Sequence, residues 1–514
     1  MKKIKKPIKI KKTESSENFK LLDDREHVRL RRGMYIPNKD YFVYELLDNG
    51  VDILINNKNS HLYAKKEITV SIDKEGIITV TDSAGALPIE ESAEVPGCSI
   101  AELCMSRLKA GTKFEEGVKS SGLNGVGASC INFLSEWFHV EIYTGGKVYD
   151  MEFEKGLITQ KLLEIDKTVN DNFTMTLIQC KPDPEIWDGQ DDFDILAINN
   201  RLKQVCYLNP ELTIKADIDY NNHNIHETYN YPEGVKTYVE ELTKNRDIIH
   251  EPWFLNRSVE MNNGKTCELS VAFVWTQSYS DNIIAFTNNV INTNNKSSNL
   301  TGFKRGIAAA IKDCFENEYP KSKTQLTAED TREGIISVIS IKVPDAIYVG
   351  QDKDYLNMPT IASILYSEIK EFCEDQFDKL PNDKDNILNK VVESNKIREA
   401  AYKAKEAARK NKGFSNKKVE KLVKCASKDP EICEVFLVEG DSAASTATTA
   451  CDKNTQAILP VFGKIPNVEE MTLDKVLSSD KLKDILYSLE CGIGDDFNID
   501  NLRYHKIIIM SDAD

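Results

Sequence analysis

Two strand-like apolar segments end in acidic side chains, and this pattern constrains the fold of the 514-residue chain more than any other feature. One segment, VFLVEGDSA, ends in Glu439 and Asp441, and the other, KIIIMSDAD, ends in Asp512 and Asp514. In an open parallel sheet, functional groups gather at the carboxyl ends of neighbouring strands. We therefore predict that Glu439, Asp512 and Asp514 lie together and can hold Mg²⁺ through their carboxylates.

Length and composition predict a protein of several globular domains. At 514 residues the chain is too long for one hydrophobic core, so about three domains are expected. No apolar run reaches the ~18 residues of a membrane span. The basic N-terminal segment MKKIKKPIKIKK lacks the apolar core of a secretory signal. We therefore expect a cytoplasmic protein that has no membrane partner.

Net charge and cysteine spacing narrow the function classes further. The net charge of −16 argues against non-specific binding of nucleic acid, so any DNA contact must be local. Basic residues cluster between Lys396 and Lys424, although composition alone favours a solvated helix face there. The 12 cysteines contain no CxxC pair, so they are expected to be reduced thiols rather than zinc ligands.

The segment DYFVYELLDNGVDILINN has apolar residues at helical spacing from Tyr41 onward. Glu45 and Asn49 are four residues apart and therefore share one face of the predicted helix. A carboxylate at this place can take a proton from an attacking water, and an amide oxygen one turn later can ligate Mg²⁺. Without its neighbours, the pair equally fits an ordinary polar helix face.

Three further segments offer candidate contacts to a nucleotide. A predicted strand over 77–81 leads to Asp82, whose carboxylate can accept a hydrogen bond from an adenine amino group. The glycines of GLNGVG precede a helix predicted to begin near Ala128, and glycines let backbone N–H groups approach phosphate. A predicted buried strand over 335–343 leads to a loop with Lys353, a point charge suited to phosphate. Each feature alone is weak, and the P-loop pattern is absent.

Together these segments resemble the GHKL ATPase pattern of the DNA gyrase B and topoisomerase IV B subunits. The acidic strand ends, with QAILPVFGKIPNVEE between them, resemble the Toprim domain of the same family. The resemblance covers nearly the whole chain after Asn18. It implies the B subunit of a type II DNA topoisomerase, an isomerase that couples ATP binding and hydrolysis to the passage of duplex DNA.

The fold implied by the resemblance is α/β and multidomain. A GHKL (Bergerat) ATPase α/β sandwich is expected in residues 1–233, including the basic N-terminal arm. A ribosomal S5-like transducer domain is expected in 234–411 and a linker in 412–430, with a long helix from Asn386 to Lys412. A partial Toprim domain, which is Rossmann-like, is expected in 431–514.

The resemblance also assigns roles at the ATP site. Glu45 is the general base, Asn49 the Mg²⁺ ligand, Asp82 the adenine contact, and Lys353 the contact to the γ-phosphate. The other implied ATP-binding residues are Lys113, Gly122, Leu123, Asn124, Gly125, Val126, Gly127, Thr174 and Gln351.

Several loops depart from the family pattern. Ala84 and Ala86 stand where two glycines are usual, so this loop is expected to be stiffer. The stretch 296–299 replaces a family Gly-Gly-Thr-His. Thr144 occupies the place of an arginine that holds aminocoumarins in gyrase B subunits. A nearby family Glu–Arg pair is missing, with isoleucine at position 53 and glycine at position 85.

For the Toprim part, the resemblance implies that Glu439 is catalytic and that Glu439, Asp512 and Asp514 bind the Mg²⁺ that assists DNA cleavage. The implied partners are double-stranded DNA, a topoisomerase A subunit carrying the catalytic tyrosine, and a second copy in an ATP-dependent homodimer. The family's D-x-D-x-D-G pattern breaks off at Asp514. We therefore expect a split gene, an interrupted reading frame or a partial sequence, bacterial or phage-encoded, and a polypeptide that completes the Toprim domain.

Two other functions remain to be weighed. The chain could be a GHKL protein of another class, such as a chaperone or sensor kinase, but the Toprim signature after Glu439 argues against this. It could also be a non-catalytic remnant of a topoisomerase B subunit that still binds ATP or DNA. The altered loops keep this second alternative open.

Overall fold

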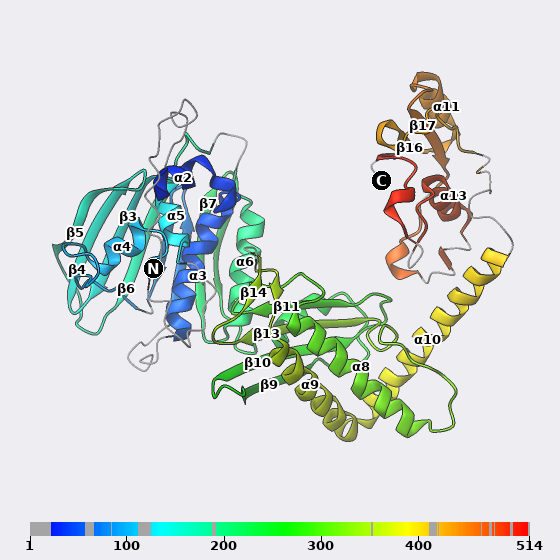
Figure 1. Cartoon of the computed structure of the whole chain (residues 1–514), viewed down its shortest axis with the longest axis horizontal. Coiled ribbons are helices and arrows are strands. Elements are labelled where there is room, and N and C mark those ends of the chain that lie inside the picture. The colour runs from blue at the N-terminus through cyan, green and yellow to red at the C-terminus, as the bar shows by residue number, and fades with distance from the viewer. Residues whose placement is uncertain are drawn as a thin grey trace, which may run out of the picture.

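The computed structural model describes residues 22–56, 66–83, 85–111, 125–187, 192–350, 353–410, 419, 421–463, 465–471, 475–476, 479–493 and 497–511. These residues form three α/β domains in chain order, and the long helix α10 (Pro381–Lys410) leads from the second domain to the third (Figure 1). Within these ranges, no helix has both the length and the apolar character needed to cross a membrane.

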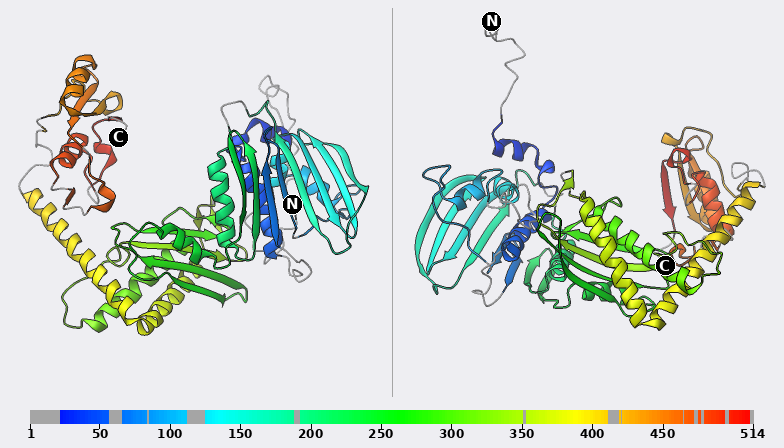
Figure 2. Two further views of the ribbon diagram at one scale, coloured as in Figure 1. Left: turned by 180° about the vertical axis from the view of Figure 1, so that it is seen from behind. Right: turned by 60° about the horizontal axis from the view of Figure 1, so that its bottom comes forward.

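The first domain is an eight-stranded sheet with helices on one face (Figure 1; Figure 2). Its strand order is β5-β4-β3-β6-β2-β1-β7-β8, and β1 pairs in parallel with β7. Alternate residues of β1 are buried, as a sheet with one covered face requires, so Ile68, Val70 and Ile72 lie in the core. The strands are β1 (Glu67–Ile72), β2 (Ile78–Asp82), β3 (Ser135–Thr144), β4 (Lys147–Glu154), β5 (Leu157–Thr168), β6 (Met175–Pro182), β7 (Thr213–Tyr220) and β8 (His223–Tyr229). The helices are α2 (Asp24–Leu30), η1 (Arg32–Met34), α3 (Asp40–Asn56), α4 (Ile100–Ser106), α5 (Gly127–Phe133) and α6 (Ile195–Leu208).

The second domain is built around β13 (Ile335–Lys342), which is buried at every residue but the last. Ile335 and Ile339 of β13 pack in the core that contains α8 and α9, and Ile336 packs in a second core with α7. The predicted buried strand over 335–343 is therefore confirmed. The other strands are β9 (Trp253–Glu260), β10 (Thr266–Trp275), β11 (Asn282–Thr287), β12 (Val290–Ile291), β14 (Tyr348–Val349) and β15 (Tyr355–Leu356). The helices are α7 (Val235–Thr243), α8 (Ser298–Glu318) and α9 (Pro359–Lys379).

Glycines bring α8 and α9 into close contact. A β-carbon on Gly302 would lie 2.6 Å from Ala362 O, so only glycine fits at this crossing. Helix α10 follows α9 after Leu380 alone. It begins at Pro381, earlier than the predicted Asn386. Proline is tolerated at the first helical position, because a backbone N–H there would have no partner within the helix. The predicted helix end at 412 lies outside the described residues.

The third domain is a parallel sheet in the order β17-β16-β18. The described residues of the predicted linker over 412–430 pack within this domain. Val419 and Cys425 are buried in the core of this domain, and Val423 bridges Ile458 of the sheet. These apolar side chains make the described residues from 421 onward part of the domain. The elements are η4 (Pro430–Ile432), β16 (Glu434–Glu439), α11 (Gly440–Ala450), β17 (Gln456–Val461), η5 (Val468–Glu470), α13 (Asp480–Leu489), η7 (Ile499–Asn501) and β18 (Lys506–Met510).

Candidate nucleotide site and acidic strand ends

Helix α3 carries the first two predicted site residues. Its apolar residues, among them Phe42 and Leu46, are buried in the core of the first domain. Glu45 and Asn49 lie one turn apart and are half-buried. The predicted amphipathic helix is therefore confirmed, and it holds the carboxylate and the amide on rigid backbone.

The carboxylate of Glu45 lies against the first residue of α5. A β-carbon built on Gly127 would stand 2.0 Å from Glu45 Oε2 and 3.0 Å from its Cδ. Burial, and then the charge of Glu45, raise the pKa of the Cys130 thiol one turn further along α5. Because Gly127 has no side chain, the N-terminal turn of α5 can come this close to the Glu45 carboxylate.

Asp82 lies at the end of β2, close to the same helix. Its side chain is 7% exposed, and a β-carbon on Gly50 of α3 would be 3.2 Å from Asp82 Cβ. The predicted strand is confirmed with a shift of one residue, because Asp82 is the last residue of β2. The buried carboxylate faces α3 near the Glu45–Asn49 pair, so a nucleotide base and its phosphates could both be reached from this helix.

Thr174 lies at the same end of the sheet. Asp82 pairs with Thr176 across β2 and β6, and Thr174 precedes Thr176 by two residues. Thr176 Oγ1 donates to Gly85 O at 3.2 Å, whereas Thr174 Oγ1 is buried with no hydrogen-bond partner among the described residues. A buried hydroxyl of this kind is costly unless a ligand or water satisfies it. This observation fits a polar ligand beside Asp82.

Asp48, which lies between Glu45 and Asn49 in the chain, forms an ion pair that the sequence did not reveal. Arg201 of α6 donates from Nη2 to both carboxylate oxygens of Asp48, at 3.0 and 3.2 Å. Burial raises the pKa of Asp48, and the positive charges of Arg201 and Lys353 offset this in part. Asp48 belongs to the segment ELLDN of the predicted helix. No pattern around Arg201 in the sequence indicated that it pairs with Asp48.

Lys353 belongs to the second domain, yet its charge acts on Asp48 of the first. Its backbone φ is 56°, in the left-handed region, which costs a side chain other than glycine about 1–2 kcal/mol. Asn292 Nδ2 donates to Lys353 O at 3.0 Å. Lys353 thus lies near helix α3, in a backbone conformation that a neighbouring side chain supports.

Part of the predicted ATP site lies outside the described residues. Gly125 is described, with φ of 58°, and its carbonyl accepts from Lys109 N–H at 2.9 Å. Val126 is the residue before α5, and its carbonyl accepts from Cys130 N–H at 2.9 Å. The predicted residues that cannot be placed are Lys113, Gly122, Leu123, Asn124, Gln351, Asp512 and Asp514.

The two acidic strand ends are neighbours, as the sequence predicted. β16 and β18 pair in parallel, with Val438 opposite Met510, so Glu439 and Ser511 come next at the same edge. Glu439 is exposed, and Asp441 follows in the first turn of α11. Carboxylate oxygens are the donors that Mg²⁺ prefers, so these residues fit such an ion. The metal site itself stays a prediction, since Asp512 and Asp514 lie beyond the described part.

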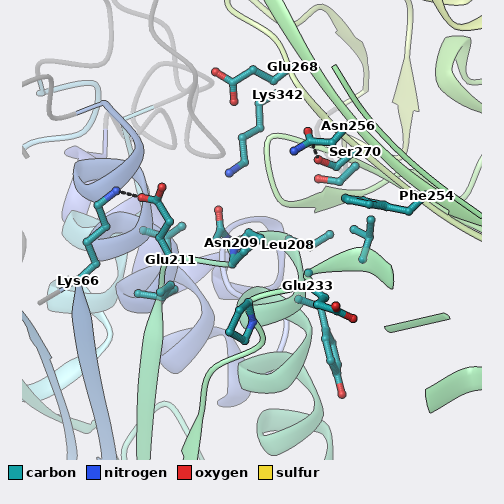
Figure 3. A pocket seen from close by; sticks show the side chains of 18 of the residues that line it. Lys66, Leu208, Asn209, Glu211, Glu233, Phe254, Asn256, Glu268, Ser270 and Lys342 are labelled. Atoms are coloured by element: carbon teal, nitrogen blue, oxygen red, sulfur yellow. Dashed lines mark hydrogen bonds and ion pairs between the residues drawn. The ribbon is translucent and has the colours of Figure 1, made fainter. Parts of the chain in front are cut away.

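A separate cavity of about 630 Å³ lies where the first two domains meet (Figure 3). Lys66 and Glu211 form an ion pair at one side, and Phe254 and Lys342 of the second domain line the other. Glu45, Asn49 and Asp82 do not line it. The cavity is therefore distinct from the candidate nucleotide site.

Comparison with known proteins gives consistent matches for each part of the chain. The family model described as DNA gyrase B matches residues 234–407, and the Toprim domain model matches 434–514. The type 2 topoisomerase B subunit of Aquifex aeolicus is 36% identical over 511 residues, which cover 97% of this chain and 62% of the relative. The DNA gyrase B subunit of Treponema denticola is 35% identical over 515 residues, which cover 97% of this chain and 78% of the relative.

A solved structure is similar to about three quarters of this chain. The 43K ATPase domain of Thermus thermophilus gyrase B, in complex with an aminocoumarin, superposes with a TM-score of 0.59 at 26% identity. The match covers 74% of this chain and 98% of that one. The chain spans about three fifths of the Aquifex relative's length and about four fifths of the Treponema relative's length.

Proposed function

Because this chain belongs to the DNA gyrase B family, we propose that it is the ATP-hydrolysing subunit of a type II DNA topoisomerase. ATP binding and hydrolysis would drive the passage of one DNA duplex through another. The contact between the Glu45 carboxylate and the start of α5, next to buried Asp82, is the observation that carries this proposal. It brings the proposed general base to the start of α5, while the proposed adenine contact, Asp82, packs against Gly50 of the same helix α3.

In this proposal each residue of the site has one chemical task. Glu45 accepts a proton from the water that attacks the γ-phosphorus, and ADP leaves as inorganic phosphate forms. Asp82 accepts a hydrogen bond from the adenine amino group, and the Thr174 hydroxyl lies at the same end of the sheet. Lys353 gives a positive charge to the γ-phosphate, where negative charge must be stabilised.

Mg²⁺ fits two places by the chemistry of the donors. Asn49 offers an amide oxygen on the same helix as Glu45, and Glu439 offers a carboxylate at the edge of the third sheet. When bound, the ion would neutralise phosphate charge at each place. At the Toprim sheet, Glu439 would act with Asp512 and Asp514 in DNA cleavage.

The partners follow from the same proposal. The chain would dimerise when ATP binds, and it would act on double-stranded DNA together with an A subunit that carries the nucleophilic tyrosine. No tyrosine of this chain is given the nucleophile's role.

The test has two parts. Purified chain should release phosphate from ATP in a coupled assay, and the Glu45→Gln variant should lose that turnover while it still binds an ATP analogue. Strand passage is then measured on supercoiled plasmid with an A subunit from the same source, with and without ATP. Phosphate release equal in the parent and in Glu45→Gln would overturn the ATPase proposal. Binding of ATP without turnover in the parent would instead favour a non-catalytic remnant.

A further inference from the structure

A buried cluster of polar side chains in the second domain contacts the backbone of Lys353. It consists of Thr287, Asn292, Ser297 and Asn299, each no more than 2% exposed. Thr287 Oγ1 and Asn299 Nδ2 donate to Asn292 Oδ1 at 2.7 and 2.6 Å, and Ser297 Oγ donates to Asn299 Oδ1 at 2.7 Å. Buried polar groups that satisfy one another in this way hold a single arrangement. We call these four residues the asparagine cluster.

The asparagine cluster fixes the backbone that carries Lys353. Asn292 Nδ2 donates to Lys353 O at 3.0 Å, and Leu356 N–H donates to Ser297 Oγ at 3.1 Å. Next to the cluster, Met358 N–H donates to Ser298 Oγ at 2.9 Å. The segment from 353 to 358 therefore rests on side chains from one short stretch of sequence. That stretch includes the positions where the family pattern differs from this chain.

Lys353 depends on such support more than an ordinary loop residue does. Its φ of 56° lies in a region that side chains other than glycine and asparagine rarely occupy. Strained backbone persists only where its surroundings hold it. The bond from Asn292 ends on the carbonyl of this same residue, so it acts where the strain is.

The hairpin that contains Asn292 also contacts the first domain. Its turn, Asn288–Asn289, has two positive φ values, 48° and 67°. Arg201 Nη1 donates to Asn289 O at 3.2 Å, and Asn209 Nδ2 donates to Asn289 Oδ1 at 3.1 Å. Arg201 in turn holds Asp48 of α3. One hairpin thus bonds at its turn to α6 and to the residue that caps this helix, and at its base to Lys353.

We propose that Asn292 is a positioning residue for Lys353. Through it, the asparagine cluster and the hairpin turn set where the lysine charge stands relative to α3. Asn292 itself does not touch the nucleotide. This inference rests on the proposed function, because it names how the contact between the second domain and the γ-phosphate is held.

The test compares affinity for an ATP analogue with affinity for ADP. The two ligands differ at the γ-phosphate, so their affinity ratio reports the contacts made to that group, and its change in a Lys353 variant reports the contribution of Lys353. Lys353→Ala should reduce the parent's preference for the non-hydrolysable triphosphate by roughly 10-fold or more, the scale of a charged hydrogen bond. Asn292→Ala should reduce it by about 3- to 10-fold and lower kcat, with ADP affinity unchanged.

Two further variants separate positioning from folding. Asn395→Ala is the matched control, because Asn395 is also 2% exposed and makes two hydrogen bonds in the same domain, away from Lys353. It should keep the parent's ratio. Asn292→Asp keeps the side-chain shape but places an acceptor against Lys353 O, so it should lower the ratio as Asn292→Ala does. The double variant Asn292→Ala with Lys353→Ala should lose no more than Lys353→Ala alone.

The outcomes distinguish the inference from the proposed function. If Asn292→Ala and Asn292→Asp keep the parent's ratio while Lys353→Ala loses it, the positioning role is wrong and the ATP site stands. The same holds if the losses of the double variant add. If the parent itself does not prefer the triphosphate, or if Lys353→Ala changes nothing, the assignment of Lys353 in the proposed function is wrong.

Discussion

The carboxylate of Glu45 and the α-carbon of Gly127 lie so close that no side chain fits between them. A β-carbon on Gly127 would stand 2.0 Å from Glu45 Oε2, a distance that no real pair of atoms of this kind adopts. The two residues come from helices far apart in the chain, α3 and α5. The position of the proposed base is therefore coupled to the presence of glycine at the start of α5.

Gly127→Ala should displace Glu45 and slow ATP hydrolysis by about 10-fold or more, because a shift of ~1 Å at a reacting group can cost up to ~10²-fold. Steady-state kcat and analogue binding would be measured together. Gly33→Ala is the matched control, since nothing lies within 4 Å of its built β-carbon. Equal kcat in Gly127→Ala and in the parent would contradict the contact.

Glu45→Ala should abolish most ATP turnover and leave nucleotide binding largely intact. A general base contributes typically ~10²–10⁴-fold to rate, far more than to ground-state affinity. Turnover is measured at saturating ATP, and binding by equilibrium titration of a non-hydrolysable analogue. A kcat within a few-fold of the parent's would remove Glu45 from this role.

The second domain should lose stability below about pH 6.5 because of His250. This side chain is 5% exposed, its Nδ1 bonds to Glu251 O at 2.7 Å, and its Nε2 accepts from Trp275 N–H at 3.2 Å. Burial lowers its pKa below the ordinary value of 6.5, although Asp383 acts in the other direction. The unfolded chain therefore takes up a proton more readily than the folded chain. The stabilisation is complete above pH 6.5 and falls as the pH drops toward the lower folded-state pKa.

Urea unfolding at pH 7.5 and at pH 5.5 measures this effect. Trp253 and Trp275 lie 4.7 and 5.7 Å from the His250 ring, so their fluorescence reports on this region. His250→Gln should be less stable than the parent at pH 7.5 and should show a smaller loss at pH 5.5. An identical loss in both proteins would assign the acid sensitivity to other groups.

Asp330→Ala should destabilise the packing of the middle of α10 on the second domain by about 2 kcal/mol. Asp330 is 3% exposed and accepts from Arg398 Nε at 2.7 Å and from Asn395 Nδ2 at 3.0 Å. Burial raises its pKa, but these bonds outweigh burial and lower the pKa overall. Removing the carboxylate leaves its donors unpaired, a cost of several kcal/mol that is reduced here because Arg398 is 39% exposed.

The control for this change is Asp281→Ala, because the Asp281 carboxylate, which pairs with Arg332, is 38% exposed, whereas that of Asp330 is 2% exposed. Its cost should stay below about 1 kcal/mol. Both variants are compared by denaturant unfolding followed through tryptophan fluorescence. Similar losses in the two variants would show that burial of Asp330 adds nothing.

Aminocoumarins should inhibit the ATPase poorly. Thr144, half-buried at the end of β3, stands where the family resemblance expects an arginine. Losing one charged contact commonly costs about 1–3 kcal/mol, or roughly 10-fold or more in affinity. Inhibition of ATP turnover is compared with that of an ordinary gyrase B, and Thr144→Arg should restore part of the difference. Tight inhibition of the unaltered chain would contradict the prediction.

Local pattern sufficed to predict the elements that carry the site. The spacing of Glu45 and Asn49, the strand before Asp82 and the buried strand β13 follow from periodicity, and the structure has all three. The neighbouring positions of β16 and β18 were also predicted, because parallel strands share an edge. In these elements the pattern of buried residues follows the helix or strand period, so a short segment of sequence is enough to predict the element.

Short sequence patterns could not predict contacts between segments that are far apart in the chain. The Asp48–Arg201 pair joins residues 153 apart, and the bond from Asn292 to Lys353 joins residues 61 apart. No local pattern indicated the buried contacts of the asparagine-rich stretch around Asn292, since asparagine is common in exposed turns. Its burial depends on the packing of α8 and the segment after 353. The extent of the third domain was missed for a similar reason, because Val419 and Cys425 are buried only by a sheet formed later in the chain.

The close crossing of α8 and α9, with α10 starting one residue after α9, has a mechanical consequence. Helices locked at Gly302 cannot slide easily, so α9 should turn as one piece with the second domain. The first half of α10 is bound to the second domain, with Ile387, Leu388 and Val391 in its core and Arg398 bonded to Asp330. The helix continues from Arg398 to Lys410, about 18 Å beyond this bond. Because its first half is held, α10 should follow any rotation of the second domain as part of the same body, and a bend of about 5° at Arg398 would move its end by only about 2 Å.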